Sequence, residues 1–212
     1  MFTTKTIALG NTTKELMWIA RDASCFDLIK HDWHQFSSFF LPLVRDRGTV
    51  VQAGGNCGLY PLYYSYLFER VFTFEPDPMN FYCLSHNCPN NKIIKFNIAL
   101  SGVAGFVSMA NPDPSNVGMH RVIPEGGTQV YGMSLDSLEI PSVGLIHLDV
   151  EGFEYPVLLG SQKTIERTRP VVVLEMSTCE SEMMQIMKDL NYKVSAYYGD
   201  PINRVFVPKE WK

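Results

Sequence analysis

GLIHLDVEG, residues 144–152, combines a buried strand with an acidic end. Its apolar residues can bury on both sides of a sheet, whereas its carboxylates and final glycine mark the end of the strand. Two earlier stretches have the same design: VVQAGGNCG, residues 50–58, and VFTFEPDP, residues 71–78. Ligands of an open α/β sheet bind outside the carboxyl ends of the strands. These three strand ends therefore predict an α/β fold that holds a nucleoside cofactor.

Length and composition fit a soluble globular protein with one main domain. The 212 residues are 46% hydrophobic and 19% charged, which is ordinary for such a domain. The formal net charge of −4 argues against broad contacts with nucleic-acid phosphates or anionic lipid. No apolar run has the length of a membrane span, and the N-terminus lacks the apolar core of a signal peptide. The five cysteines form no CxxC pair, which predicts reduced, packed thiols in a cytoplasmic protein.

The periodicity of the chain changes near residue 48. Residues 14–29 and 33–45 carry apolar residues at mixed three and four spacing, which predicts a helical N-terminal lead-in over residues 1–48. Residues 49–212 alternate strand and helix patterns, as parallel βαβ units do. Strands are expected at 49–53, 70–75, 92–100, 104–109, 128–133, 144–149, 171–176, 193–197 and 204–207, and helices at 59–69, 78–87, 155–167 and 180–190. Residues 111–127, rich in proline and glycine, are expected to form a loop.

The sequence AGGNCG, residues 53–58, follows a predicted strand and opens a helix. Without side chains, Gly54, Gly55 and Gly58 allow a tight turn and a close approach of the backbone to a ligand. The N–H groups at the helix start favour an anion or a carboxylate. A plain strand-to-helix turn explains the glycines equally well. The spacing differs from the dinucleotide pattern GxGxxG, which argues against a nicotinamide enzyme.

Glu75 ends the next predicted strand, 21 positions after Gly54. An acid at this point of an α/β fold commonly accepts the hydroxyl hydrogens of a ribose. The alternative is a solvated acid at a strand end, but the preceding glycine turn favours the ribose contact. Pro76-Asp77-Pro78 then forces a turn and starts a helix, with Asp77 as its expected cap.

His147, Asp149 and Glu151 alternate along the central strand and would share one side of it if the strand continued. Imidazole and carboxylates are ordinary metal ligands, but Glu151 is expected past the strand end, so no metal site is predicted. For His147 a core position is favoured over a ligand role. Asp149, at a central strand end, is the best candidate for a role beside the cofactor. Glu175, which ends VVVLE, is expected either to orient backbone N–H groups or to contact substrate.

Together these residues resemble the FkbM-type family of S-adenosylmethionine-dependent methyltransferases. The similar stretches cover about residues 49–175 in the family's order: VVQAGGNCGLY, FTFEPDPMNFYCL, FNIALSGVAG, SNVGMHRV, VYGMSLDSL, IHLDVEGFEYPVLLGS and RPVVVLE. The most specific feature is DVEGFEYPVLLG after an FEP strand. The resemblance implies a Rossmann-like class I methyltransferase fold. Its sheet would be seven-stranded and mostly parallel, with an antiparallel last strand and helices on both faces.

The resemblance also implies roles for individual residues. Gly54, Asn56 and Gly58 would line the methionine part of S-adenosylmethionine, and Glu75 would bind its ribose. Residues 97–101 would lie beside the adenine, and Asp149 would face the reaction centre. The complete predicted cofactor-binding set is Gln52, Gly54, Gly55, Asn56, Gly58, Glu75, Pro76, Asn97, Ala99, Ser101 and Asp149.

Two positions depart from the family pattern. The family usually has an acid where Gln52 stands on the first strand, and a lysine where His147 precedes the aspartate. Gln52 still donates and accepts hydrogen bonds, but it places no charge beside the cofactor's ammonium group. This departure makes a non-catalytic nucleoside-binding module with the same fold the main alternative.

The leading prediction is an S-adenosylmethionine-dependent O-methyltransferase that acts on a hydroxyl of a small molecule, sugar or glycan. Positioning of acceptor oxygen, methyl carbon and sulfur in line can contribute about 7–11 kcal/mol. A carboxylate or histidine would take the acceptor proton, with Asp149 the first candidate and His147 or Glu151 the next. The acidic composition favours a small-molecule or carbohydrate acceptor over nucleic acid. An apolar helix face in residues 1–45 fits internal packing and a partner chain equally.

Overall fold

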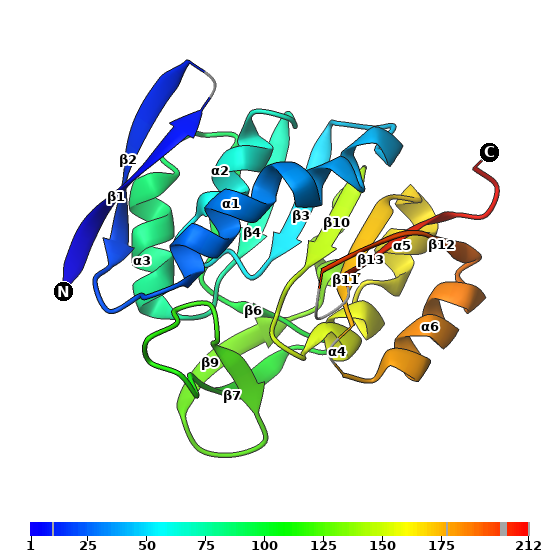
Figure 1. Ribbon diagram of the computed structural model, residues 1–212. Coiled ribbons are helices and arrows are strands. Elements are labelled where there is room, and N and C mark those ends of the chain that lie inside the picture. Colours follow the sequence, from blue (N-terminus) through cyan, green and yellow to red (C-terminus); the bar gives the residue numbers. More distant parts are fainter. Residues whose placement is uncertain (10, 177, 200–202, 212) are drawn as a thin grey trace.

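A seven-stranded sheet forms the centre of the computed structural model, which describes residues 1–9, 11–176, 178–199 and 203–211 (Figure 1). In order across the sheet, the strands are β12 (Tyr192–Tyr198), β13 (Asn203–Pro208), β11 (Val171–Glu175), β10 (Leu145–Leu148), β3 (Thr49–Ala53), β4 (Arg70–Phe74) and β5 (Ile93–Phe96). The middle strands β3, β10 and β11 are buried almost throughout. Their valine-rich and leucine-rich sequences suit strands that are covered on both faces.

The sheet is mixed. β3 pairs in parallel with β10 and with β4, and the parallel set continues to β11 on one side and to β5 on the other. β13 is antiparallel to both of its neighbours, β11 and β12. The carboxyl ends of β4, β3, β10 and β11 therefore meet at one edge of the sheet. All three stretches that decided the fold prediction end there.

Helices cover both faces of the sheet (Figure 1). The helices of one face are α1 (Cys25–Ser38), α2 (Leu59–Ser65) and α3 (Pro78–Asn87). Those of the other face are α4 (Glu154–Leu159), α5 (Gln162–Thr168) and α6 (Glu180–Asp189). Successive strand residues point to opposite faces. Val50 and Leu145 accordingly pack in the core under α1 and α2, while Val51 and Ile146 pack in the core under α4 to α6.

The prediction of a helical lead-in is wrong for residues 2–9 and 12–19. These residues form an antiparallel hairpin of β1 (Phe2–Leu9) and β2 (Thr12–Ile19). Leu16 and Trp18, two positions apart, are both fully buried, as in a strand. The three and four spacing of residues 14–29 arose because that window joins the end of β2 to the start of α1. α1 and a short 3-10 helix, η1 (Leu41–Leu43), are helical as predicted.

A side chain far along the chain holds the hairpin in place. Asn87, the last residue of α3 (Pro78–Asn87), donates from its amide to the Met17 carbonyl at 2.7 Å. The amide oxygen of the same residue accepts the Met17 N–H at 2.7 Å. This pairing satisfies the backbone of β2 from outside the hairpin, which local sequence periodicity does not reveal.

A second sheet of four strands contributes a wall to the cavity at the strand ends. Its strands, in spatial order, are β6 (Ala99–Leu100), β9 (Thr128–Met133), β7 (Gly105–Ala110) and β8 (Arg121–Ile123). β8 pairs with β7, so the prediction of a continuous loop over residues 111–127 is wrong for residues 121–123. Three residues paired at the sheet edge are too few to show a period in the sequence.

The expected helix over residues 155–167 is divided into α4 and α5. The carbonyl of Gly160 leaves the helical pattern to accept the N–H of Asp136, which comes from the 3-10 helix η2 (Leu135–Leu138). None of the described helices is both long and apolar enough to cross a bilayer. The division of the chain into units at residue 48 stays a prediction.

Candidate active site

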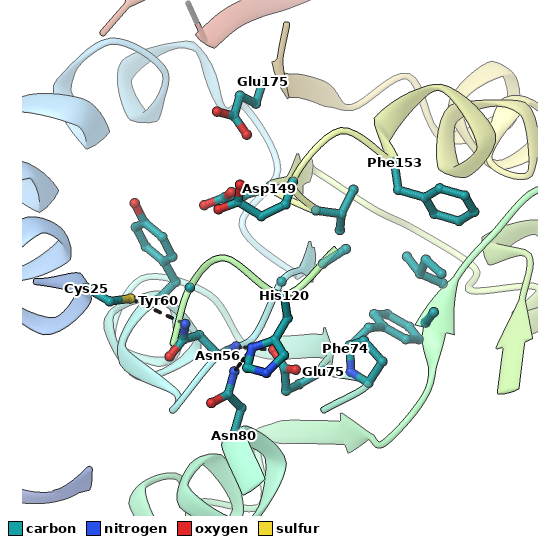
Figure 2. A pocket seen from close by; sticks show the side chains of 18 of the residues that line it. Cys25, Asn56, Tyr60, Phe74, Glu75, Asn80, His120, Asp149, Phe153 and Glu175 are labelled. Carbon is teal, nitrogen blue, oxygen red and sulfur yellow. Dashed lines mark hydrogen bonds between the residues drawn. The ribbon is translucent and has the colours of Figure 1, made fainter. Parts of the chain in front are cut away.

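A cavity of about 340 Å³ lies at the carboxyl ends of β4, β3, β10 and β11 (Figure 2). α1, α2, α3, the second sheet and residues 116–120 supply its other walls. The predicted site residues that line it are Gly54, Asn56, Glu75, Pro76, Ala99, Asp149 and Glu151. The structure thus brings residues from three separate strand ends to one space.

Glu75 lies at one end of this cavity, with its carboxylate held by backbone N–H groups. One oxygen accepts the N–H of Asn56 at 2.6 Å, and the other accepts the N–H of Asp77 at 2.8 Å. Burial raises the pKa of Glu75 to about 8, and the two N–H groups act against this rise. The Asn80 side chain also donates to this carboxylate, so three of its roughly four lone-pair sites are used within the protein. The carboxylate can therefore still accept a hydroxyl hydrogen of a bound diol.

The glycines of the turn allow the protein to pack against itself. Gly54 has a φ of +86°, and a Cβ there would overlap the carbonyl oxygen of Asp149. Its neighbour Gly55 and the later Gly58 are not part of the cavity lining; both are packed against Leu84 on α3. A plain structural turn thus accounts for the last two glycines. Of the three glycines in this turn, Gly54 is the one that lines the cavity.

An apolar wall adjoins Glu75. It is formed by Phe74, Ala99, Leu100, Met109 and Phe153. In Figure 2, Phe74 and Phe153 lie on the same side of the cavity. An apolar surface beside a buried carboxylate suits a ligand that combines a flat base with a sugar.

Two residues predicted beside the adenine do not line the cavity. Asn97 donates from its amide to the carbonyls of Glu75 at 2.8 Å and Pro76 at 3.1 Å, and so supports the turn after β4. Ser101 is buried behind the lining residues, and its N–H donates to the Met133 carbonyl at 2.9 Å. Of Asn97, Ala99 and Ser101, it is Ala99 that lines the cavity.

The loop at residues 115–120 closes the side of the cavity near Glu75. The Val117 carbonyl accepts the side-chain N–H groups of Asn56 at 3.2 Å and Asn80 at 2.9 Å. The His120 ring hydrogen-bonds the same carbonyl at 3.0 Å and lies 3.3 Å from the Asp77 carboxylate. The loop is therefore fixed to the glycine turn and to the start of α3.

Asn80 and His120 line the cavity but were absent from the predicted set. The buried residues of α3 stand at positions 80, 83, 84 and 87, the spacing of one helix face. An asparagine on such a face signals a buried hydrogen bond, because buried polar groups need partners. That signal was present in the sequence for Asn80. For His120, in an irregular loop, no spacing signal exists.

Three carboxylates stand at the ends of β10 and β11. Burial, followed by the nearby carboxylates of Glu151 and Glu154, raises the pKa of Asp149 to about 7. Burial and Glu175 raise the pKa of Glu151 to about 7. Burial and Asp149 raise the pKa of Glu175 to about 8. Groups with pKa values this close to neutrality, gathered in one cavity, are typical of sites that move protons or bind cations.

Most of the chain that forms this cavity matches a known protein family. The model of the methyltransferase FkbM domain matches residues 54–194. This chain belongs to the FkbM methyltransferase family. The match contains the glycine turn, Glu75, the loop at residues 115–120 and the acidic end of β10.

Similar proteins agree with this assignment. AglP, a hexuronic acid methyltransferase of Haloferax volcanii, is 31% identical over 110 residues, which are 49% of this chain and 46% of AglP. A methyltransferase FkbM from Methylobacillus flagellatus has a TM-score of 0.59 and 15% identity, over 83% of this chain and 50% of its own. Precorrin-6y C5,15-methyltransferase from Geobacter metallireducens has a TM-score of 0.53 and 13% identity, over 83% of this chain and 88% of its own. The chain spans about half the length of the first two.

The cavity of this FkbM protein fits S-adenosylmethionine, the methyl donor that the fold family generally uses. Glu75 offers a buried acceptor for ribose hydroxyls, and the apolar wall around Phe74 offers a surface for adenine. Gly54 and Asn56 line the stretch between Glu75 and Asp149, where the methionine part would lie. The carboxylates beyond it would face the cationic sulfonium.

His147, which stands where FkbM proteins usually have lysine, does not line the cavity. It is 1% exposed and shares a 2.9 Å hydrogen bond between Nδ1 and the Tyr64 hydroxyl. The rings of Phe36, Tyr60 and Phe40 surround it. Burial lowers the pKa of His147 to about 3, so the ring is neutral in the folded protein. The structure places it in the core under α1 and α2.

We expect His147 to control stability in acid. Its pKa is lower in the folded chain than in the unfolded chain, so its contribution is present above about pH 6.5 and is lost as pH falls toward 3. His147→Gln keeps a polar partner for Tyr64 but does not titrate. Between pH 6 and 4, the wild-type free energy of unfolding should fall relative to the variant by about 1.4 kcal/mol per pH unit. Urea unfolding at several pH values measures this, and parallel curves for the two proteins would contradict it.

Gln52, which stands where the family usually has an acid, is also turned away from the cavity. Its amide N–H groups donate to the carbonyls of Ala53 at 3.1 Å and Gly54 at 2.7 Å, and its oxygen accepts the Thr73 hydroxyl at 2.7 Å. The residue is fully buried. All of its hydrogen-bonding groups therefore serve the protein, and an uncharged amide is what these two carbonyls require.

Restoring the family's acid at this position should destabilise the protein. In Gln52→Asp a buried carboxylate would face the carbonyl oxygens that the amide now satisfies. The matched control is Gln52→Asn, which has the same shorter length but keeps an amide. We expect the aspartate variant to be less stable than the asparagine variant by about 2–3 kcal/mol in urea unfolding. Equal stability, with tighter binding of S-adenosylhomocysteine by the aspartate variant, would refute this reading.

Proposed function

We propose that this protein is an S-adenosylmethionine-dependent O-methyltransferase that acts on a hydroxyl of a small molecule or carbohydrate. The observation that carries the proposal is that the buried carboxylate of Glu75 and the carboxylate of Asp149 line the same cavity. Membership of the FkbM family supports methyl transfer. AglP, which is named for a hexuronic acid, supports a carbohydrate acceptor.

Asp149 is the group that we assign as the base. When bound, the donor supplies a methyl group already activated by its sulfonium, so the protein's main task is alignment of the acceptor oxygen. A carboxylate whose pKa is raised to about 7 can take up the acceptor's proton and release it again near neutral pH. Glu151 is the second candidate, since it lines the same part of the cavity. His147 is not assigned this role because it lies in the core.

The alternative is a binding module that holds a nucleoside without transferring a methyl group. Gln52 is the observation that favours it, because the usual acid of the first strand is replaced by an internally bonded amide. Both functions require nucleoside binding at Glu75. They differ in whether a methyl group is transferred.

The test has two stages. Calorimetric titration with S-adenosylhomocysteine comes first, and we expect binding in the micromolar range. At about 100 times its dissociation constant the ligand should add roughly 2.7 kcal/mol to stability. Labelled donor is then supplied with a panel of sugars and small alcohols. Transfer of label supports the enzyme, binding without transfer supports the module, and a folded protein that does not bind would refute both.

A further inference from the structure

Carboxylates line the cavity from end to end. They are Asp32 on α1 and, at the strand ends, Glu75, Asp149, Glu151 and Glu175. Figure 2 shows Glu75 and Glu175 at opposite ends, with Asp149 between them. The sheet order explains this arrangement, since the ends of β4 and β11 are separated by three strand spacings, about 14 Å. Glu175 therefore lies on the far side of Asp149 from the nucleoside end.

Few positive groups balance these carboxylates. No lysine or arginine is found among the described residues that line the cavity. His120 lines it, but its ring is paired with Asp77. Arg204, on the strand beside β11, is paired with Glu180. Arg121 lowers the pKa of Glu151, but by less than burial and the neighbouring carboxylates raise it.

The proposed donor supplies only part of the missing positive charge. S-adenosylmethionine carries a sulfonium and an ammonium group against one carboxylate. Glu75 is assigned to the ribose, which leaves the other four of the five lining carboxylates to share one net positive charge. Like charges in a partly buried space are costly, and without a cation among them they take up protons, as the raised pKa values of Glu151 (about 7) and Glu175 (about 8) show. A cation bound between them would return both groups to the charged form. The far end of the cavity thus remains electrostatically unmatched by the donor.

We propose that the acceptor carries a protonated amine next to the hydroxyl that is methylated, and that Glu151 and Glu175 bind this amine. The inference rests on the proposed methyltransferase function and names its acceptor class as an amino alcohol or amino sugar. Leu28 and Ile29 of α1 line the same cavity and offer apolar contact to the body of the acceptor. A uronic acid, the acceptor type in the name of AglP, would add a carboxylate to this end and be repelled.

Three small probes isolate the charge preference from the shape of a complete acceptor. Ethanolamine, ethylene glycol and glycolate each present a hydroxyl on a short carbon chain, and they are cationic, neutral and anionic. Each is titrated into the full chain saturated with S-adenosylhomocysteine, and the amide NMR signals of Val150, Glu151 and Glu175 are followed. We expect ethanolamine to bind at least about tenfold more tightly than ethylene glycol, with glycolate weakest.

Two variants test whether the carboxylates cause this preference. Glu175→Gln should weaken ethanolamine binding about tenfold and leave ethylene glycol binding unchanged. The control is Glu166→Gln, the same loss of charge at an exposed position of α5, which should change neither. Affinity for S-adenosylhomocysteine should stay within about twofold in both variants, because Glu175 is assigned to the acceptor.

The outcomes separate this inference from the function on which it rests. Glycolate binding as tightly as ethanolamine, or no response to any probe, would overturn the amine proposal while leaving cofactor binding intact. A large loss of S-adenosylhomocysteine affinity in Glu175→Gln would also overturn it, since the carboxylate would then serve the ammonium group of the cofactor. Failure of the wild type to bind S-adenosylhomocysteine would instead refute the proposed function. The affinities of the three probes would in that case be compared in the protein without S-adenosylhomocysteine.

Discussion

Asp149→Asn is expected to reduce the rate of methyl transfer by about 100-fold to 10,000-fold, the usual contribution of a general base. Asparagine has the same shape but does not accept the proton of the acceptor hydroxyl. Since the Asp149 pKa is raised to about 7, the wild-type rate should increase with pH up to about that value and then level off. The variant should lose this pH dependence. Labelled-methyl transfer across pH 5 to 9 measures both effects.

Glu151→Gln is the matched comparison for this prediction. Glu151 has a similar pKa of about 7 and lines the same cavity, but it lies past the end of β10. We expect it to affect acceptor affinity more than the maximal rate. S-adenosylhomocysteine binding to Asp149→Asn should remain within about threefold of the wild type, which separates the base from a cofactor contact. Full turnover of Asp149→Asn with normal cofactor affinity would end the assignment of this residue as the base.

Glu75→Gln is expected to weaken S-adenosylhomocysteine binding by about 100-fold. Hydrogen bonds to a charged acceptor contribute about 1.5–3 kcal/mol each, and above the Glu75 pKa of about 8 the substitution removes the charge that the ribose hydroxyls would meet. The glutamine amide would also direct N–H groups at the N–H of Asn56 or Asp77, which the carboxylate now accepts. Calorimetric titration measures the affinity, and urea unfolding measures the accompanying loss of stability.

Asp77→Asn is the control for Glu75→Gln. Asp77 lies in the same turn and caps α3 by accepting the N–H groups of Met79 at 2.9 Å and Asn80 at 2.8 Å, but it does not line the cavity. Its substitution should cost up to about 1 kcal/mol of stability and leave the affinity for S-adenosylhomocysteine within about threefold of the wild-type value. Equal weakening of binding in both variants would show that the turn as a whole, rather than the Glu75 carboxylate, holds the ligand.

Several features of the site follow from short-range patterns. A parallel strand that is covered on both faces needs a continuous apolar run, and its ligand-facing end needs glycine or polar residues. GLIHLDVEG, VVQAGGNCG and VFTFEPDP carry both signals, so the central strands and their functional ends were predictable. The meeting of Gly54, Glu75 and Asp149 in one cavity follows because parallel strands end at the same edge.

Other features depend on residues far apart in the chain. The Tyr64 hydroxyl that holds His147 is 83 positions away, and Asn87, which holds the hairpin at Met17, is 70 positions away. The same is true of the Val117 carbonyl, which Asn56 and Asn80 fix over the cavity. Periodicity reports which face of an element is buried, but it does not say which distant group supplies the hydrogen bond.

The sequence by itself determined the α/β fold, the strand ends that carry Glu75 and Asp149, and the methyltransferase family that they resemble. Only the tertiary structure decided that Gln52 and His147 are internal, that Gly55 and Gly58 serve packing, and that residues 2–9 and 12–19 pair as a hairpin. The physical reason is the range of the interactions. Strand burial and turn geometry act between neighbours in sequence, whereas buried hydrogen bonds and close packing join segments that only the folded chain brings together.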